Sequence, residues 1–187
     1  GEAPGPDVLC VVLDAAKLGA VPVTVPLRDN RFDLDALLDA VTPRTKIVFI
    51  ATPNNPTGTM TTRTELDAYL ERVPEHVLTV IDQAYLEYVD DAEYPDAIAE
   101  YARAGHRVLV LRTFSKIYGL AGLRVGYGIG PASVIEAIGK VRRAFDVTTA
   151  GQVAALASLG DEAELARRRA VNRDAMSRLE RLLREHG

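Results

Sequence analysis

The sequence predicts an α/β fold in which a mostly parallel sheet is sandwiched by helices. Short apolar segments alternate along the chain with longer amphipathic ones, which is the pattern of repeated strand and helix units. Three of the short segments, residues 47–50, 77–81 and 108–111, are almost continuously apolar. Such segments are typical of parallel strands, because helices cover both faces of the sheet.

Apolar spacing and helix start signals set the limits of the expected elements. Thr62 and Glu65 have the spacing of a capping box at the start of one helix. Pro131 and Ser133 favour a second helix start, and Gly19 suits a helix end. The expected strands are 21–25, 47–51, 77–82, 108–113 and 125–129, and the expected helices are 7–18, 33–40, 62–72 and 133–143.

The segment 161–187 is expected to form one long exposed helix. Glu164 with Arg168, and Glu180 with Arg184, are spaced to form ion pairs along such a helix. Acidic residues flank its run of arginines, so a solvated helix face is favoured over a basic binding patch. That run consists of Arg167, Arg168 and Arg169.

Composition indicates a soluble globular chain. Of the 187 residues, 48% are hydrophobic and 26% are charged, which excludes a disordered or fibrous protein. The formal charge of −4 calls for neither nucleic acid nor an anionic membrane. Neither a spanning apolar stretch of roughly 20 residues nor a secretory signal is expected. The single cysteine, Cys10, suits a reducing cytoplasm.

Polar residues follow three of the expected strands. The segment 52–58 follows the expected strand 47–51. Asp82 and Tyr85 lie at the end of the strand 77–82, and Ser115 and Lys116 follow the strand 108–113. Each feature alone has an ordinary explanation as a turn, a helix cap, a core tyrosine or a surface lysine. Together they predict a ligand site, because open α/β sheets bind ligands at the carboxyl ends of their strands.

Three segments carry a family resemblance. The sequences Pro-Asn-Asn-Pro-Thr-Gly at 53–58, Asp-Gln-Ala-Tyr at 82–85 and Thr-Phe-Ser-Lys-Ile-Tyr-Gly-Leu-Ala-Gly-Leu-Arg-Val-Gly at 113–126 resemble those of fold-type-I aminotransferases. The resemblance is strongest to the histidinol-phosphate and aromatic amino-acid branch. It extends from about Gly19 to the end of the chain, and the third segment is its most specific part.

The resemblance implies pyridoxal 5'-phosphate as cofactor, with Lys116, Asp82 and Tyr85 as the catalytic residues. Lys116 would bond to the cofactor aldehyde and then act as the base in proton transfer. Asp82 would keep the pyridine nitrogen protonated. Asn55 and Tyr85 would donate hydrogen bonds to the ring's phenolic oxygen.

The same resemblance assigns the remaining cofactor contacts. Thr113, Ser115 and Arg124 would bind the phosphate, and the guanidinium of Arg124 suits a contact through two hydrogen bonds. The small side chain of Ala84 would pack against the face of the ring. Gln83 stands where glutamate is more usual in the family, and this change is expected to matter little.

Two functional parts of the family are expected to lie outside this chain: an upstream helix start that binds phosphate, and a downstream arginine that binds the substrate carboxylate. Residues 1–160 would then be part of the large cofactor-binding domain. Residues 161–187 would be a helix leading toward a small C-terminal domain. The implied activity is amino-group transfer between histidinol phosphate or an aromatic amino acid and a 2-oxo acid such as 2-oxoglutarate, in a homodimer.

Other interpretations are open. The chain could be a truncated relative that binds cofactor or a partner but catalyses weakly or not at all. Decarboxylation of threonine phosphate is a less favoured activity of the same branch. The glycines at 126, 128 and 130 resemble a dinucleotide loop, but Ser133 occupies the place of its last glycine, so strand packing is favoured. The three histidines lack the spacing of a metal site.

Overall fold

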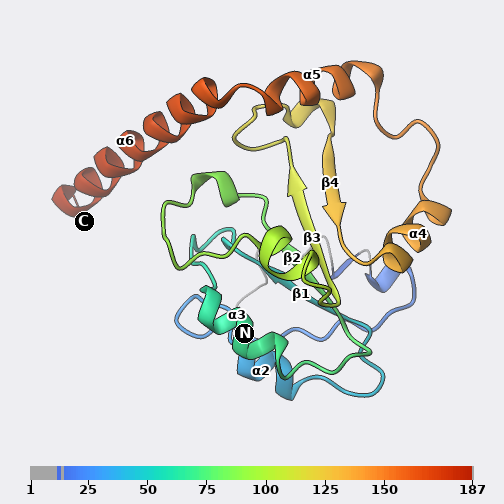
Figure 1. The fold of residues 1–187 in the computed structure, drawn as a ribbon. Coiled ribbons are helices and arrows are strands. Elements are labelled where there is room, and N and C mark those ends of the chain that lie inside the picture. The colour runs from blue at the N-terminus through green and yellow to red at the C-terminus, as the bar shows by residue number, and fades with distance from the viewer. Residues whose placement is uncertain (1–11, 14, 187) are drawn as a thin grey trace.

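The computed structural model of the chain describes residues 12–13 and 15–186 (Figure 1). Its sheet has the strand order β1-β2-β3-β4. The first three strands are parallel, and the last runs antiparallel to its neighbour. The strands are β1 (Ile47–Ala51), β2 (Leu78–Asp82), β3 (Val108–Thr113) and β4 (Gly126–Ile129). The predicted α/β fold with a mostly parallel sheet is therefore confirmed.

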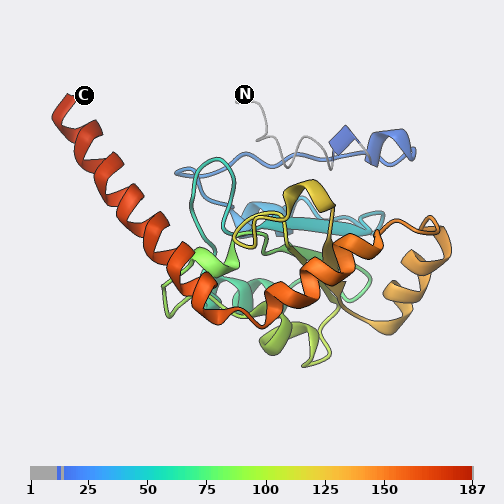
Figure 2. The same ribbon diagram turned by 90° about the horizontal axis from the view of Figure 1, so that it is seen from above.

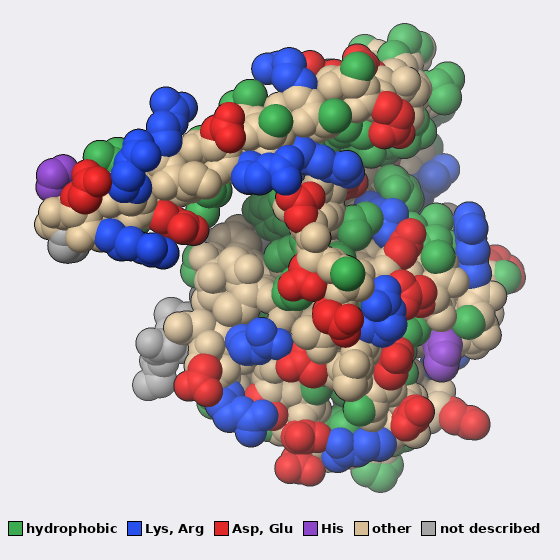
Figure 3. All heavy atoms as spheres, turned by 60° about the vertical axis from the view of Figure 1, so that its left-hand side comes forward, with side chains coloured by type: hydrophobic (Ala, Val, Ile, Leu, Met, Phe, Trp, Pro, Cys, Tyr) green, Lys and Arg blue, Asp and Glu red, His purple; other side chains and the backbone are tan. Residues whose placement is uncertain are grey.

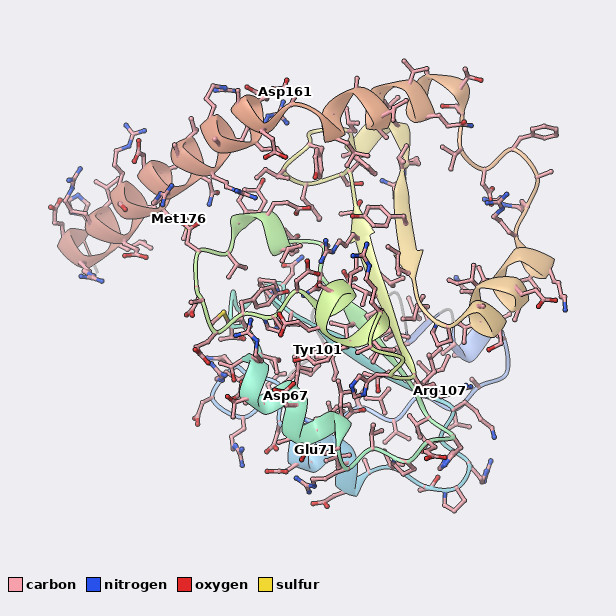
Figure 4. The ribbon with its side chains drawn as sticks, in the orientation of Figure 1. Asp67, Glu71, Tyr101, Arg107, Asp161 and Met176 are labelled. Carbon is pink, nitrogen blue, oxygen red and sulfur yellow. The ribbon has the colours of Figure 1, made fainter. Side chains whose placement is uncertain are left out.

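Apolar side chains are buried on both faces of the sheet, as the continuous apolar segments predict. On one face, Ile50, Ile81 and Val110 pack with residues of the helices α2 (Leu34–Asp39), α3 (Arg63–Leu70) and η2 (Ile98–Ala102). On the other face, a smaller cluster contains Leu78, Val80 and Leu109, with Val134 of the helix α4 (Ala132–Val141) against it. A polar contact also joins two of the helices, since the Tyr101 hydroxyl of η2 donates to Asp67 of α3 at 2.9 Å (Figure 4).

The helix starts show which capping signals were informative. Thr62 and Glu65 form the predicted capping box of α3, with the Thr62 amide donating to the Glu65 carboxylate at 2.7 Å. Asp33 caps α2 by accepting from the Ala36 amide at 3.1 Å. Helix α4 begins one residue before the predicted 133, with Pro131 at its N-cap and no side-chain cap.

Two further differences from the sequence expectations concern whole elements. Residues 21–25 do not form the predicted strand. Val21 and Val23 are exposed there, so their alternating pattern has no neighbouring strand to pack against. Helix α5 (Thr149–Leu159) was not predicted, although Thr148 caps it by accepting from the Gly151 amide. The predicted helix 7–18 begins outside the described residues, whose helical part covers residues 12–13 and 15–17.

The predicted C-terminal helix is confirmed as α6 (Glu162–His186). It extends away from the sheet in two perpendicular views (Figures 1 and 2). Both predicted ion pairs form: Arg168 Nε lies 2.7 Å from Glu164 Oε1, and Arg184 Nη2 lies 3.7 Å from Glu180 Oε2. No helix among the described residues is long and apolar enough to cross a membrane.

Glycines let β4 approach β3 closely, as the strand-packing interpretation expects. A Cβ atom added to Gly130 would lie 2.9 Å from the carbonyl oxygen of Val108, closer than side chains tolerate. At Gly128, an added Cβ would lie 3.3 Å from the side chains of Leu109 and Leu111. The glycines at 128 and 130 therefore allow β4 to pack closely against β3.

Candidate active site

The carboxyl ends of β1, β2 and β3 lie side by side, because the three strands are parallel neighbours. This arrangement brings Asn55, Tyr85 and Lys116 together from three loops. The Asn55 side-chain amide donates to the Tyr85 hydroxyl at 3.5 Å. The Lys116 ammonium lies 4.8 Å from the centroid of the Tyr85 ring. The lysine side chain is exposed and the other two are half-buried, so the amine is accessible to a small molecule.

Asp82 is the last residue of β2 and is half-buried. Its carboxylate accepts a hydrogen bond from the Ala84 amide at 3.0 Å, which orients the turn that leads to Tyr85. On β1, Ala51 is its partner in the register, so Asp82 lies beside the start of the loop that carries Asn55. Sequence reasoning thus places Asp82, Ala84, Tyr85 and Asn55 at one edge of the sheet, and the structure agrees.

Thr113 is the last residue of β3, and Ser115 lies in the turn that follows it. The Thr113 hydroxyl accepts from the Ser115 amide at 3.0 Å and donates to the Val125 carbonyl at 3.4 Å. Thr113 also pairs with Gly126 in the register, which places Arg124 at the same end of the sheet. Arg124 has a left-handed backbone (φ 54°), and its guanidinium donates to the Ala121 carbonyl at 2.9 Å. In this structure the guanidinium is thus bonded to its own turn.

Gln83 has a buried role that the sequence did not indicate. The side chain is fully buried, and its amide nitrogen donates to the Tyr94 hydroxyl at 3.1 Å and to the Pro95 carbonyl at 2.9 Å. Its amide oxygen accepts from Arg112 at 3.1 Å. A carbonyl can only accept and a guanidinium can only donate, so the orientation of the amide is fixed by its partners.

The Gln83 contacts reach all three strand ends. Burial raises the pKa of Tyr94, whose hydroxyl stays protonated and donates to the Thr52 carbonyl at the end of β1. Arg112 belongs to β3 and also pairs with Asp96 at 2.6 Å. A glutamate at 83 could accept from the arginine but could not donate to the Pro95 carbonyl. The amide therefore matches its surroundings better than a carboxylate would.

Helix α6 contacts the loops that carry Tyr85 and Lys116. Basic side chains line much of this helix (Figure 3). Arg168 donates to the Ile117 carbonyl at 2.7 Å, and Arg169 donates to the Glu87 carbonyl at 2.6 Å. The prediction of a solvated face for the arginine run is therefore wrong for these two residues, because the helix packs on loops distant in sequence. Arg167 agrees with the prediction, since it pairs with Glu164 in the same helix.

A hollow of about 340 Å³ lies between the Lys116 loop and α6. Its wall includes Lys116 and Tyr88 on the side of the sheet, and Arg168 and Asn172 on the side of the helix. The described residues contain no cluster of acidic, histidine or cysteine side chains that could hold a metal ion. Chemically, the strand ends offer an accessible amine, a carboxylate and several hydroxyl and amide groups.

An exposed lysine beside a tyrosine ring, at the carboxyl edge of a parallel sheet whose strand β2 ends in an aspartate, marks an α/β protein that can bond a carbonyl compound. The comparisons with known proteins narrow this class. Residues 13–186 match the model of the family described as aminotransferase class I and II. The chain therefore belongs to this family, whose members use pyridoxal phosphate.

Two curated relatives illustrate the match. The histidinol-phosphate aminotransferase of Moorella thermoacetica is 50% identical over 159 residues, which are 84% of this chain and 41% of the relative. The aromatic amino acid aminotransferase of Thermobifida fusca is 54% identical over 153 residues, which are 82% of this chain and 42% of the relative. The chain thus spans less than half the length of either relative.

A solved structure agrees in fold. The histidinol-phosphate aminotransferase of Sinorhizobium meliloti, in complex with pyridoxal-5'-phosphate, matches with a TM-score of 0.82 and 33% identity. The match covers 90% of this chain and 46% of that one. The fold is therefore that of a fold-type-I aminotransferase.

The residues present fit the cofactor of the family. Pyridoxal phosphate requires an amine for its aldehyde, a carboxylate for its ring nitrogen and donors for its phenolic oxygen and phosphate. Lys116 lies over Tyr85, Asn55 bonds to the hydroxyl of that tyrosine, and Asp82 ends the strand that precedes it. Hydroxyl groups for a phosphate stand one strand away, on Thr113 and Ser115.

Proposed function

We propose that this chain forms the cofactor-binding core of a pyridoxal-phosphate-dependent aminotransferase, with Lys116 as the lysine that bonds to the cofactor. The observation that carries the proposal is the convergence of three strand ends on one amine: Lys116 lies 4.8 Å from the ring of Tyr85, whose hydroxyl accepts from Asn55 at 3.5 Å. Family membership over residues 13–186 supports it.

The cofactor, when bound, would supply an electron sink for the reacting amino acid. The side chains of this chain would take the following roles. Lys116 would hold the cofactor through its aldehyde carbon, with loss of water, and once released would accept and return the proton of the reacting carbon. Asp82 would hold a proton on the ring nitrogen by its negative charge. Tyr85 and Asn55 would donate to the phenolic oxygen.

The phosphate would be held at the ends of β3 and β4. The hydroxyl groups of Thr113 and Ser115 would donate to it, and the Arg124 guanidinium, which donates to the Ala121 carbonyl in this structure, would bind the anion instead. Ala84 leaves room for the ring because its side chain is a single methyl group.

The proposed reaction transfers an amino group from histidinol phosphate or an aromatic amino acid to a 2-oxo acid such as 2-oxoglutarate. The relatives in Moorella thermoacetica and Thermobifida fusca support these two amino donors, since their names state them. In the whole protein, residues 1–160 would belong to the large domain and 161–187 to a helix leading to a small domain. We also propose that the whole protein is a homodimer located in the cytoplasm.

A second candidate is a module that binds cofactor but catalyses weakly or not at all. The share of the relatives' length that the chain spans, 41% and 42%, favours it for the 187-residue chain alone. Positioning of the substrate is a large part of catalysis, so groups supplied by the rest of a longer protein decide between the two candidates.

The test is chemical trapping of the cofactor on the 187-residue chain. The chain is mixed with pyridoxal phosphate and reduced with borohydride, and the modified peptide is identified by mass spectrometry. We expect the adduct on Lys116 and its loss in Lys116→Ala. The matched control is Lys140→Ala, because Lys140 is an exposed lysine that pairs with Glu136 on α4. An adduct spread equally over the lysines, and unchanged by Lys116→Ala, would contradict the proposal.

A further inference from the structure

The turn that carries Lys116 has an unusual neighbour in α6. The Gly119 amide donates to the Lys116 carbonyl at 2.9 Å, which closes a tight turn directly after the lysine. Gly119 has a φ of +71°, a conformation that residues with a side chain rarely adopt. The next amide, of Leu120, donates to the Phe114 carbonyl at 2.9 Å and returns the chain to the end of β3.

The guanidinium of Arg168 fills the space beside that turn. A Cβ atom added to Gly119 would lie 2.6 Å from Arg168 Nη1, so the arginine occupies the position where any other residue would place its side chain. The same nitrogen donates to the Ile117 carbonyl at 2.7 Å, inside the turn. Two features therefore favour glycine at position 119: the left-handed backbone conformation and the close approach of the arginine.

Glu164 holds this arginine in place from the helix side. Arg168 Nε donates to Glu164 Oε1 at 2.7 Å, one helical turn earlier. The guanidinium is thus fixed at both ends, by a carboxylate on α6 and by a carbonyl in the lysine turn. Next to it, Arg169 donates to the Glu87 carbonyl at 2.6 Å, in the short helix η1 (Leu86–Tyr88) that follows Tyr85.

We infer that Arg168, with Arg169 beside it, is a positioning residue: it clamps the turn of Lys116 onto α6 and so sets the lysine amine relative to Tyr85. Both arginines act through backbone carbonyls, so neither touches the reacting atoms. The inference rests on the proposed function of Lys116. It adds that the helix after residue 161 is part of the machinery that presents the amine.

The test compares Arg168→Met with Arg178→Met in the 187-residue chain. Methionine keeps an unbranched apolar stem and removes the guanidinium. Arg178 is the matched control, because it is exposed on the distal part of the same helix. Two rates are measured. The first is the rate at which borohydride traps pyridoxal phosphate on Lys116. The second is the rate of hydrogen exchange of the Gly119 and Leu120 amides without cofactor. The melting temperature of each variant reports global stability.

We expect Arg168→Met to slow trapping between about tenfold and a hundredfold, the scale of loss from a misplaced reacting group. The two amides should exchange faster, while the amides of β2 and β3 keep their rates. The control should match the unaltered chain in both measurements. Trapping and exchange unchanged in Arg168→Met would overturn the inference. A uniform rise in exchange across the sheet would also overturn it, since that outcome reports a purely structural role.

Different measurements test the proposed function and the role of Arg168, so either can be contradicted without the other. If the unaltered chain traps no cofactor at Lys116, the proposed function fails, and amide exchange still decides whether Arg168 holds the turn. Should Arg168→Met not fold, Arg168→Gln takes its place, since the shorter amide cannot bridge Glu164 and Ile117. A third variant, Gly119→Ala, should slow trapping in the unaltered background more than in Arg168→Gln, where the clash with the guanidinium is gone. Equal slowing in both backgrounds would contradict the close contact.

Discussion

Single side chains at the site are held by groups that follow them closely in the sequence or lie behind them in the core. Asp82 accepts from the Ala84 amide, and Thr113 accepts from the Ser115 amide, so local turns orient both residues. Gln83 directly follows Asp82 and bonds to Tyr94 and Pro95 in the interior. Its three hydrogen bonds, two of them buried and the one from Arg112 half-buried, connect the strand ends on which the site is built.

Gln83→Leu should therefore lower the free energy of unfolding by about 2 kcal/mol or more, because each buried polar partner left unpaired costs about 1–3 kcal/mol. The Pro95 carbonyl would lose the amide that donates to it, and the Arg112 guanidinium would lose Gln83 but keep its pair with Asp96. Urea denaturation followed by circular dichroism measures the change. Gln152→Leu serves as the control, since Gln152 is exposed on α5 and should leave stability nearly unchanged. Equal stability of the two variants would show that the buried amide contributes little.

At the scale of elements, α6 is attached to the body by three arginines. Arg168 and Arg169 bond to the carbonyls of Ile117 and Glu87, and Arg173 pairs with Asp90 at 2.9 Å. The first of these contacts depends on Glu164, which accepts from Arg168 within the helix. The attachment of the helix is therefore linked to the charge of one carboxylate.

The hydrogen bonds from Arg167 and then Arg168 lower the pKa of Glu164 from 4.5 to about 2. A carboxyl whose pKa falls on folding stabilises the native chain above its unfolded value, and this contribution disappears as the pH falls toward the folded value. The melting temperature of Glu164→Gln should lie below that of the unaltered chain at neutral pH. The difference should shrink between pH 4.5 and about 2. A difference that is constant over this range would contradict the ion-pair explanation.

The elements also show what the sequence could predict. The strands 47–51 and 108–113 were predicted with the limits of β1 and β3, because buried parallel strands are continuous apolar segments. Residues 21–25 carry three valines at alternating positions but have no neighbouring strand, and sequence spacing does not reveal a missing partner. Helix α5 was missed because its small and apolar residues lack the charged face that marks an exposed helix.

The site could be predicted as far as its local motifs reach. Asn55, Asp82, Tyr85 and Lys116 were expected at strand ends, and the structure brings them to one edge of the sheet. Their roles toward a cofactor stay a prediction. The contacts of Arg168 with Ile117 join residues 51 positions apart. Because such contacts depend on how helices pack, spacing along the chain did not indicate them.

For the molecule as a whole, the sheet supplies three strand ends, and α6 packs against the loops that follow two of them, those of Tyr85 and Lys116. The chain spans less than half the length of the two relatives and of the solved structure compared above. It nonetheless contains the amine, the carboxylate and the phenol that we propose as the groups that hold pyridoxal phosphate. The central claim is that these groups receive one ring-shaped aldehyde between them.

A crystal structure of the 187-residue chain soaked with pyridoxal phosphate tests this claim most directly. We predict continuous electron density from Lys116 Nζ to the cofactor, with the Asp82 carboxylate against the ring nitrogen and the Tyr85 hydroxyl at the phenolic oxygen. Density for the cofactor at another place on the chain, with Lys116 unmodified and Asp82 turned away from it, would contradict the claim.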